Sequence, residues 1–374
     1  MAYSVMAKAQ DLERRGKKII HLEIGQPDFE TPDNIKIAAV ESINMGRTKY
    51  SPSLGIPELR RAIADYITKT RRYFVDWKNI AVTPSGKTAI ALAMASIIER
   101  GDEVIYPDPG FPAYESFITF FGAVPKPLPI IENKNFSFDL EKLKELISSK
   151  TKLIIINSPS NPTGGIISQS DLEEVAGLAE KYNCFVLADE IYSRIIYDNE
   201  DYPSFYSLPG IKERTFLLDG FSKSFAMTGW RLGYLACPSN LMSILDRLAV
   251  NIFGCTATFI QDAGIVALTG DQTTVSKMVK EFEERRDVVV AGLNDIPGIT
   301  CRKPQGSFYA FPNIKKTGID AEELADRLLE EAGVAVLPGT AFGKFGDGYL
   351  RVSYANSLDN IKDGLNQIKK FLSK

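Results

Sequence analysis

Residues 219–234 read DGFSKSFAMTGWRLGY, and this stretch is the most informative about the fold of the chain. It lies between two short apolar runs, TFLL at 215–218 and YLAC at 234–237, which we expect to be buried strands. Lys223 therefore lies in a glycine-flanked turn between strands, where a solvated surface lysine is uncommon. A lysine amine that is partly desolvated, or close to another cation, has a lowered pKa and attacks carbonyl groups. Arg231 is able to supply such a charge or to bind a phosphate, unless both side chains simply reach solvent.

The composition argues against several classes of function. With 374 residues the chain exceeds what one hydrophobic core usually serves, so we expect two domains. The formal net charge of -3, from 44 basic and 47 acidic side chains, gives no support for nucleic-acid binding, which needs a basic face. No apolar run approaches the roughly 18 residues that span a bilayer, and the N-terminus lacks the apolar core of a secretory signal. We therefore expect a cytoplasmic protein without a membrane partner.

Cysteine and histidine do not form a recognisable metal site. The four cysteines lie far apart in the sequence, and three of them adjoin apolar strands, so we expect buried thiols more than disulfides. They are Cys184, Cys237, Cys255 and Cys301. His21 is the only histidine, which argues against serine or cysteine triads and against multi-histidine metal sites. Acid–base chemistry must then come from lysine, tyrosine or a carboxylate.

Helix and strand patterns alternate from about residue 36 to residue 274. Short apolar strands separated by helices indicate a mainly parallel sheet that is covered by helices on both faces. The expected strands are 79–83, 103–106, 123–128, 152–157, 184–188, 215–218 and 234–237. The expected helices are 57–72, 88–100, 140–149 and 169–182, with a long helical stretch from about 239.

After residue 274 the pattern changes to short strands mixed with helices. The expected helices are 276–294, 321–332 and a final one, and the expected strands are 299–303, 307–311, 334–337 and 349–353. We therefore predict an α/β fold with a large domain, residues 36–274, and a smaller α+β domain made of residues 1–35 and 275–374.

Ligands of such sheets bind beyond the carboxyl ends of the strands, so the residues after each strand are the candidates. After 79–83 comes Pro84-Ser85-Gly86-Lys87-Thr88 and then a helix, whose free N–H groups are suited to a phosphate. The Gly-Lys-Thr sequence is not a nucleotide-binding P-loop, because that motif needs glycine at position 81, which is alanine. A capped helix without a ligand is the alternative.

Two further strand ends carry polar side chains. Asn161 follows the strand at 152–157 and precedes a proline, which holds it extended and can direct its amide into the cleft. Asp189, Glu190 and Tyr192 follow the strand at 184–188. A buried carboxylate at Asp189 is costly unless it meets a cation or is satisfied by backbone donors. Glu190 is expected to point the other way, since strand side chains alternate.

Together and in this order, these motifs resemble those of the class I and II aminotransferases, pyridoxal-phosphate enzymes of fold type I. The resemblance covers nearly the whole chain, from Ile24-Gly25-Gln-Pro-Asp-Phe through Lys49-Tyr50-Ser-Pro-Ser-Leu-Gly to Leu350-Arg351-Val-Ser. The chain is most similar in appearance to aspartate-type enzymes of bacteria and archaea.

The resemblance implies a role for each motif. Lys223 would hold pyridoxal phosphate as a Schiff base, and Asp189 would pair with its ring nitrogen and keep the ring an electron sink. Tyr192 and Asn161 would bind the ring hydroxyl oxygen. Arg351 would bind the substrate α-carboxylate as a two-pronged fork, assisted by Asn161 and the Gly25 backbone.

The remaining implied contacts concern the ring face, the phosphate and a second subunit. Phe111 would stack on the cofactor ring, and Tyr50 would reach the phosphate of the neighbouring subunit, which implies a homodimer with shared active sites. The residues that would surround the phosphate within one chain are Ser85, Gly86, Lys87 and Arg231. The chain departs from many relatives at Gly220, where they have serine or threonine, and in a short N-terminal arm before the strand at 18–23.

We therefore expect an aminotransferase that moves the amino group of an L-amino acid to a 2-oxo acid, with 2-oxoglutarate as the expected acceptor. Lys87 resembles a lysine that reads the distal carboxylate of aspartate, although a solvated or phosphate-binding lysine is an equal alternative. A lyase or synthase with the same cofactor needs the same residues and stays open. A nicotinamide-dependent oxidoreductase lacks its Gly-x-Gly-x-x-Gly after a strand, and a regulatory protein lacks an attached DNA-binding unit.

Overall fold

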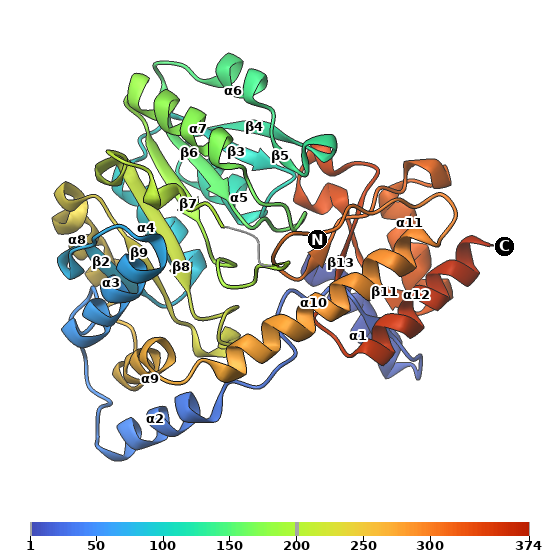
Figure 1. Ribbon diagram of the computed structural model, residues 1–374, viewed down its shortest axis with the longest axis horizontal. Coiled ribbons are helices and arrows are strands. Elements are labelled where there is room, and N and C mark those ends of the chain that lie inside the picture. Colours follow the sequence, from blue (N-terminus) through green and yellow to red (C-terminus); the bar gives the residue numbers. More distant parts are fainter. Residues whose placement is uncertain (1, 199–201, 374) are drawn as a thin grey trace.

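The computed structural model describes residues 2–198 and 202–373, and its centre is an eight-stranded sheet in the order β2-β9-β8-β7-β6-β3-β4-β5 (Figure 1). Strands β8, β7, β6, β3 and β4 run parallel. Strand β9 is antiparallel to both of its neighbours, and β5 is antiparallel to β4. The mainly parallel sheet that the sequence predicts is thus confirmed. The strands are β2 Ile80–Thr83, β3 Glu103–Asp108, β4 Val124–Ile131, β5 Ser137–Phe138, β6 Thr151–Asn157, β7 Phe185–Asp189, β8 Thr215–Gly220 and β9 Gly233–Ala236.

Helices cover both faces of this sheet, and the central strands are apolar on both faces for that reason. Along β6, Leu153 and Ile155 pack in one core with helices α4 and α8, whereas Ile154 and Ile156 pack in a second core with α3 and α7. All four side chains are buried, as alternation along a strand between two covered faces requires. These helices and their neighbours are α3 Pro57–Arg71, α4 Gly86–Ile97, α5 Ala113–Phe120, α6 Leu140–Leu146, α7 Gln169–Lys181, α8 Met242–Ile252 and α9 Thr258–Thr269.

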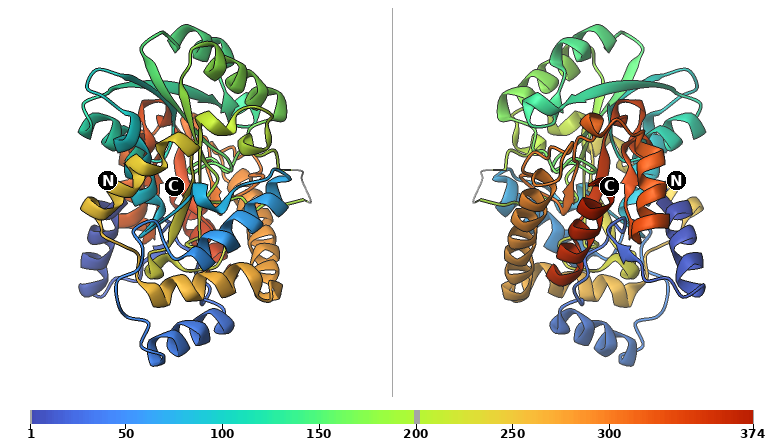
Figure 2. Two further views of the ribbon diagram at one scale, coloured as in Figure 1. Left: turned by 90° about the vertical axis from the view of Figure 1, so that its left-hand side faces the viewer. Right: turned by 90° about the vertical axis from the view of Figure 1, so that its right-hand side faces the viewer.

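The C-terminal part forms smaller sheets beside the N-terminal segment (Figures 1 and 2). Strand β13 (Leu350–Ser353) lies between β10 (Tyr309–Ala310) and β12 (Leu337–Pro338) and is antiparallel to both. Strand β1 (Ile20–His21) pairs with β11 (Val334–Ala335) in parallel. The first strand of the chain is therefore hydrogen-bonded to a strand of the C-terminal part. The helices of this part are α1 Ala2–Arg14, α10 Thr273–Asn294, α11 Ala321–Arg327 and α12 Leu358–Leu372, and α2 Asp33–Asn44 follows β1.

The structure differs from the sequence prediction at several boundaries. The helix expected at 88–100 begins at Gly86, because the Ser85 hydroxyl caps it by accepting a hydrogen bond from the Thr88 N–H at 3.1 Å. The helical stretch after 239 is divided into α8 and α9 around Gly254, whose φ of +74° favours glycine. The run 334–337 serves two different sheets, and residue 300 makes only an isolated bridge to Asn313 where a strand was expected.

A buried ionic network joins α3 to the ends of two central strands. Arg71, in the last turn of α3, pairs with Glu190 and Asp219 at 2.9 Å each, and all three side chains are almost fully buried. Ser204 donates to Glu190 at 2.6 Å, and Ser193 donates to Asp219 at 2.9 Å. Burial alone would lower the pKa of Arg71, but the two carboxylates raise it well above its usual value. Glu190 thus points away from Asp189 into this network, as strand alternation predicts.

Replacement of Arg71 by leucine is expected to lower the free energy of unfolding by about 3–5 kcal/mol, because two buried carboxylates lose their cation. Urea unfolding followed by circular dichroism measures this change. The matched control is Arg14→Leu, which removes an exposed arginine that pairs with Asp11 on its own helix and should change stability little. Equal effects of the two variants would contradict a structural role for the network.

Candidate active site

Lys223 lies in the connection between β8 and β9, which pair directly at Gly220 and Gly233. A Cβ atom on Gly233 would lie 2.8 Å from the backbone nitrogen of Gly86, so glycine is needed where β9 approaches the start of α4. The N–H groups at the start of an α-helix have no partner within the helix, and those that precede Thr88, whose N–H is capped by Ser85, can face an anion. The loop therefore places a lysine beside an anion-binding helix start.

The Lys223 amine is buried near three cations and near the Asp189 carboxylate, which acts on its pKa in the opposite direction. Its Nζ donates to the Gly25 carbonyl oxygen. Burial lowers the pKa of Lys223 to about 7, and the positive charges of Arg351, Arg231 and Lys87 contribute in the same direction. Above pH 7 most of the amine is therefore neutral and able to attack a carbonyl carbon.

Asp189 is the last residue of β7 and is 4% exposed. Its carboxylate accepts hydrogen bonds from the Tyr114 hydroxyl at 2.7 Å and from the Ile191 N–H at 3.2 Å. Neither donor is charged, and no ion pair to Asp189 is formed by the described residues. Burial raises the pKa of Asp189 to about 6, and the nearby carboxylates of Asp219 and Glu190 add to the rise. A buried carboxylate of this kind is suited to a cationic N–H donor from a ligand.

Arg351 is a further buried group to which the described residues offer no ion pair. It lies on β13 and is 5% exposed, and burial lowers its pKa. Its guanidinium donates to the Asn161 side-chain oxygen at 3.2 Å and to the Glu23 carbonyl oxygen. The buried Nε has no hydrogen-bond partner in the described part of the chain. The guanidinium also faces the rings of Tyr309 and Phe342, at 4.4 and 4.9 Å from their centroids. Such a planar fork is suited to a carboxylate.

Tyr192 lies between these groups and Lys223. Its hydroxyl is 3.0 Å from that of Tyr309, and the two rings meet edge to face at 5.8 Å. The Lys223 Nζ is 5.9 Å from the centroid of the Tyr192 ring. The structure thus brings Lys223, Tyr192 and Arg351 into one site.

The expected phosphate residues lie at the start of α4 and in the Lys223 loop. Arg231 is exposed, has a φ of +57°, and donates to the Thr228 carbonyl oxygen. Lys87 is exposed, and its Nζ is 5.7 Å from the centroid of the Phe111 ring. Because both cations act on the pKa of Lys223, they lie within electrostatic reach of its amine. This end of the site is therefore positive.

Tyr50 is the predicted site residue that stands apart. Its side chain is 98% exposed. A single chain therefore gives it no enclosed position beside Lys223.

Sequence reasoning missed three residues of the site. Tyr114 holds Asp189, and Tyr309 and Phe342 flank the Arg351 guanidinium. The sequence predicts a strand at 307–311 but gives none of these three side chains a role in the site. Their contacts join residues that are far apart in the chain, so spacing alone does not reveal them.

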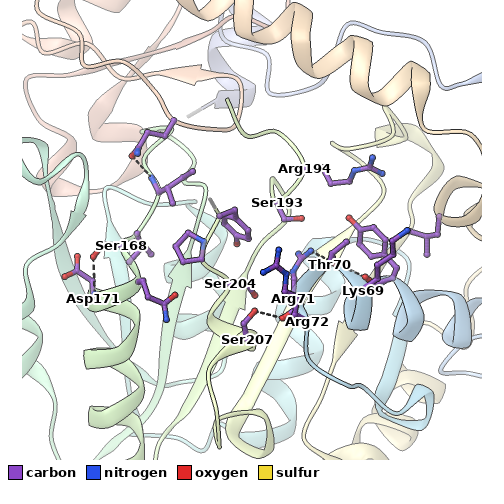
Figure 3. Close-up of a pocket in the computed structure, with 18 of the residues that line it drawn as sticks. Lys69, Thr70, Arg71, Arg72, Ser168, Asp171, Ser193, Arg194, Ser204 and Ser207 are labelled. Carbon is purple, nitrogen blue, oxygen red and sulfur yellow. Dashed lines mark hydrogen bonds between the residues drawn. The ribbon is translucent and has the colours of Figure 1, made fainter. Parts of the chain in front are cut away.

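A cavity of about 1400 Å³ lies elsewhere, between the end of α3 and the start of α7 (Figure 3). Arg71 and Arg72 line it from α3, Ser168 from the start of α7, and Ser193 and Arg194 from the turn after β7. None of the predicted site residues lines this cavity. The volume of this cavity therefore does not identify the candidate active site.

The known proteins to which this chain is similar, given below, belong to one family. Residues 17–368 match the family described as aminotransferase class I and II. The chain is 42% identical to an aspartate aminotransferase of Pyrococcus horikoshii, over 98% of this chain and 94% of the relative. It is 38% identical to aromatic-amino-acid aminotransferase 2 of Thermococcus litoralis, over 99% and 95%. The solved alanine aminotransferase from Pyrococcus furiosus superposes with a TM-score of 0.95 at 33% identity, over 100% of this chain and 96% of the other. These names agree on the reaction but not on the amino acid.

Without cofactor, Lys223 is expected to react with acetic anhydride with a pH midpoint near 7, because its neutral form increases as the pH rises through that value. Mass spectrometry of the labelled protein measures the midpoint. Lys142 is the internal control, since its pKa is raised by Glu145 and it should react only at much higher pH. Arg351→Met should raise the Lys223 midpoint by removing a nearby positive charge. Parallel labelling of Lys223 and Lys142 would contradict the cationic environment.

Proposed function

The chain belongs to the class I and II aminotransferases, and from that membership we propose a role for each residue of its site and a dicarboxylic substrate. It is a pyridoxal-phosphate-dependent enzyme of fold type I that moves the amino group of an amino acid to a 2-oxo acid. The residue roles, the preferred amino acid, 2-oxoglutarate as acceptor and the assembly are our proposals.

Three features of the site fit the cofactor. The buried Asp189 carboxylate lacks a cation, which the ring nitrogen of pyridoxal phosphate supplies. The start of α4, with Ser85, Gly86 and Lys87, would offer N–H groups and positive charge to the phosphate. Arg231, from the Lys223 loop, would add a second positive charge. Phe111 would cover the ring, and this role is supported by its edge-to-face packing on Tyr114, which itself holds Asp189. When bound, the cofactor supplies a ring that withdraws electrons from the substrate α-carbon.

Lys223 would hold the cofactor and later move the substrate proton. An amine with a pKa of about 7 is a nucleophile at neutral pH, and it both accepts and releases a proton there. After the substrate amine displaces it, the freed Lys223 amine would accept the proton of the substrate α-carbon and, as its conjugate acid, would release that proton again to complete the transfer. Tyr192 and Asn161 would donate hydrogen bonds to the ring oxygen and fix its position.

Arg351 is the strongest support for an amino-acid substrate. A buried guanidinium with an unpaired Nε and only neutral partners needs an anion, and the α-carboxylate is one. Asn161 and the Gly25 backbone border the same space, since Asn161 contacts Arg351 and Gly25 contacts Lys223. Lys87, whose positive charge contributes to lowering the pKa of Lys223, would bind the distal carboxylate of aspartate or glutamate.

We also propose a homodimer with shared sites. Ile37, Val40 and Ile43 form one face of α2 and are 56%, 57% and 46% exposed, and Met45 just beyond is 74% exposed. This helix extends from the body of the chain and packs against α9 (Figure 1). An apolar face of this kind is typical of a protein interface. A second copy that covers it would give the exposed Tyr50 a position at the partner site.

The domain division and location are proposed on structural grounds. Residues 36–274 would form the large cofactor-binding domain, and residues 1–35 and 275–374 the smaller one, which the pairing of β1 with β11 supports. Within the described residues, no helix has both the length and the apolar character to cross a bilayer. We propose a cytoplasmic location.

Single half-reactions with aspartate, glutamate, alanine and phenylalanine, followed by cofactor absorbance, test the substrate assignment. Arg351→Lys keeps the charge but loses the fork, so all four substrates should slow. Lys87→Ala should slow aspartate and glutamate by about ten- to a hundredfold, the equivalent of roughly 1.5–3 kcal/mol, and spare the other two. Lys223→Ala is the control that should lose the yellow absorbance of the linked cofactor. An equal loss for all four substrates in Lys87→Ala would assign Lys87 to the phosphate and end the aspartate preference.

Subunit mixing tests the shared site. Equal amounts of Lys223→Ala and Tyr50→Ala chains should regain activity at about a quarter of the sites, because each heterodimer has one site with neither lesion. Activity after verified exchange of subunits is the measurement. The control mixes Lys223→Ala with Asp189→Ala, which leaves a lesion in every site if both residues act within one chain. Equal recovery in both mixtures, or none in the first, would argue that Tyr50 does not cross the interface.

A further inference from the structure

Two neighbouring strands, β10 and β13, fix the position of Tyr309 in the site. It lies on β10 directly opposite Ser353 of β13, and side chains directly opposite one another point to the same face. Arg351 precedes Ser353 by two residues, so it points to that face as well. The Tyr309 ring accordingly lies under the Arg351 guanidinium, 4.4 Å from its centroid, and Tyr309 is 1% exposed.

The hydroxyl end of Tyr309 meets Tyr192. The two hydroxyl oxygens are 3.0 Å apart, and the perpendicular rings restrict rotation of either side chain. A Cβ atom on Gly25 would lie 2.6 Å from the Tyr309 hydroxyl oxygen. Glycine at position 25 therefore leaves the space that this hydroxyl occupies.

We propose that Tyr309 is a positioning residue that couples the carboxylate-binding guanidinium of Arg351 to the hydroxyl of Tyr192. This inference rests on the proposed roles of Arg351 and Tyr192. It adds a residue that touches neither the cofactor nor the substrate in those roles.

The direction of the hydrogen bond follows from proton counting. Each tyrosine hydroxyl has one proton to donate. When Tyr192 donates its proton to the ring oxygen of the cofactor, the bond between the two tyrosines needs Tyr309 as its donor. A hydroxyl that accepts a hydrogen bond becomes a stronger donor itself. Tyr309 thus strengthens the contact of Tyr192 with the ring oxygen and favours the state in which that oxygen is negative.

The ring of Tyr309 has the second role. A guanidinium above an aromatic face is attracted by its negative charge distribution, and this attraction is larger when both groups are desolvated. Tyr309 and Phe342 together hold the plane of the Arg351 guanidinium in place for a carboxylate. The two ends of Tyr309 therefore serve two separable functions.

Two substitutions separate them. Tyr309→Phe keeps the ring and removes the hydroxyl, so the pH midpoint of the cofactor absorbance should rise by about half a unit, a threefold change in the proton equilibrium. The affinity for 2-methylalanine, which has the α-carboxylate but neither an α-proton nor a distal carboxylate, should stay within about twofold. Tyr309→Leu should raise the midpoint similarly and also weaken 2-methylalanine by about tenfold. Both quantities come from absorbance titrations and not from turnover.

Tyr354→Phe is the matched control. It removes another fully buried hydroxyl of the same region, which donates to the Ser307 carbonyl oxygen at 3.3 Å and is hydrogen-bonded with Tyr197. Neither quantity should change in it. An unchanged midpoint in Tyr309→Phe, or a similar shift in Tyr354→Phe, would overturn the coupling. Should Tyr309→Leu fail to fold, Tyr309→Phe still decides the point.

Tyr192→Phe distinguishes the failure of this inference from failure of the proposed function. If it shifts the midpoint and Tyr309→Phe does not, Tyr192 keeps its role and only the coupling is wrong. If Tyr192→Phe leaves the midpoint unchanged, the proposed role of Tyr192 is wrong, and the coupling is wrong with it.

Discussion

The site depends on one electrostatic constraint, which is that the Lys223 amine must remain largely neutral next to several cations. Burial and the charges of Arg351, Arg231 and Lys87 meet this constraint together by lowering its pKa to about 7. The same cations leave the site positively charged, so it attracts a phosphate and carboxylates. One arrangement therefore activates the nucleophile and selects the charge of its ligands.

The sheet supplies the geometry that this constraint needs. Because β6 and β7 are parallel, their carboxyl ends lie side by side and bring the region of Asn161 next to Asp189. The antiparallel entry of β9 beside β8 forms the loop that carries Lys223. The Arg71 network compensates the two carboxylates behind the site and leaves Asp189 without a cation.

The sequence predicted the parts of this design that depend on local pattern. Continuous apolar runs identified the central strands, and the residues after each strand included Asp189, Asn161 and the cap at Ser85. Element boundaries were less accurate where tertiary contacts decide them. The division of the helical stretch at Gly254 and the sharing of 334–337 between two sheets follow from packing partners that are distant in the chain.

The sequence by itself determined the class of fold, the family motifs and the placement of Lys223 between two strands, because each is encoded in a short stretch whose periodicity or spacing has a direct physical meaning. Only the tertiary structure decided that Tyr309 contacts both Arg351 and Tyr192, that Arg71 neutralises Glu190 and Asp219, and that the Arg351 Nε is unpaired. Two of these sets of contacts join residues a hundred or more positions apart in the chain, namely Tyr192 with Tyr309 and Arg71 with its two carboxylates. The contact of Tyr309 with Arg351 joins the neighbouring strands β10 and β13. Burial and partner geometry arise only when those segments pack, and burial shifts the pKa values of Lys223, Asp189 and Arg351.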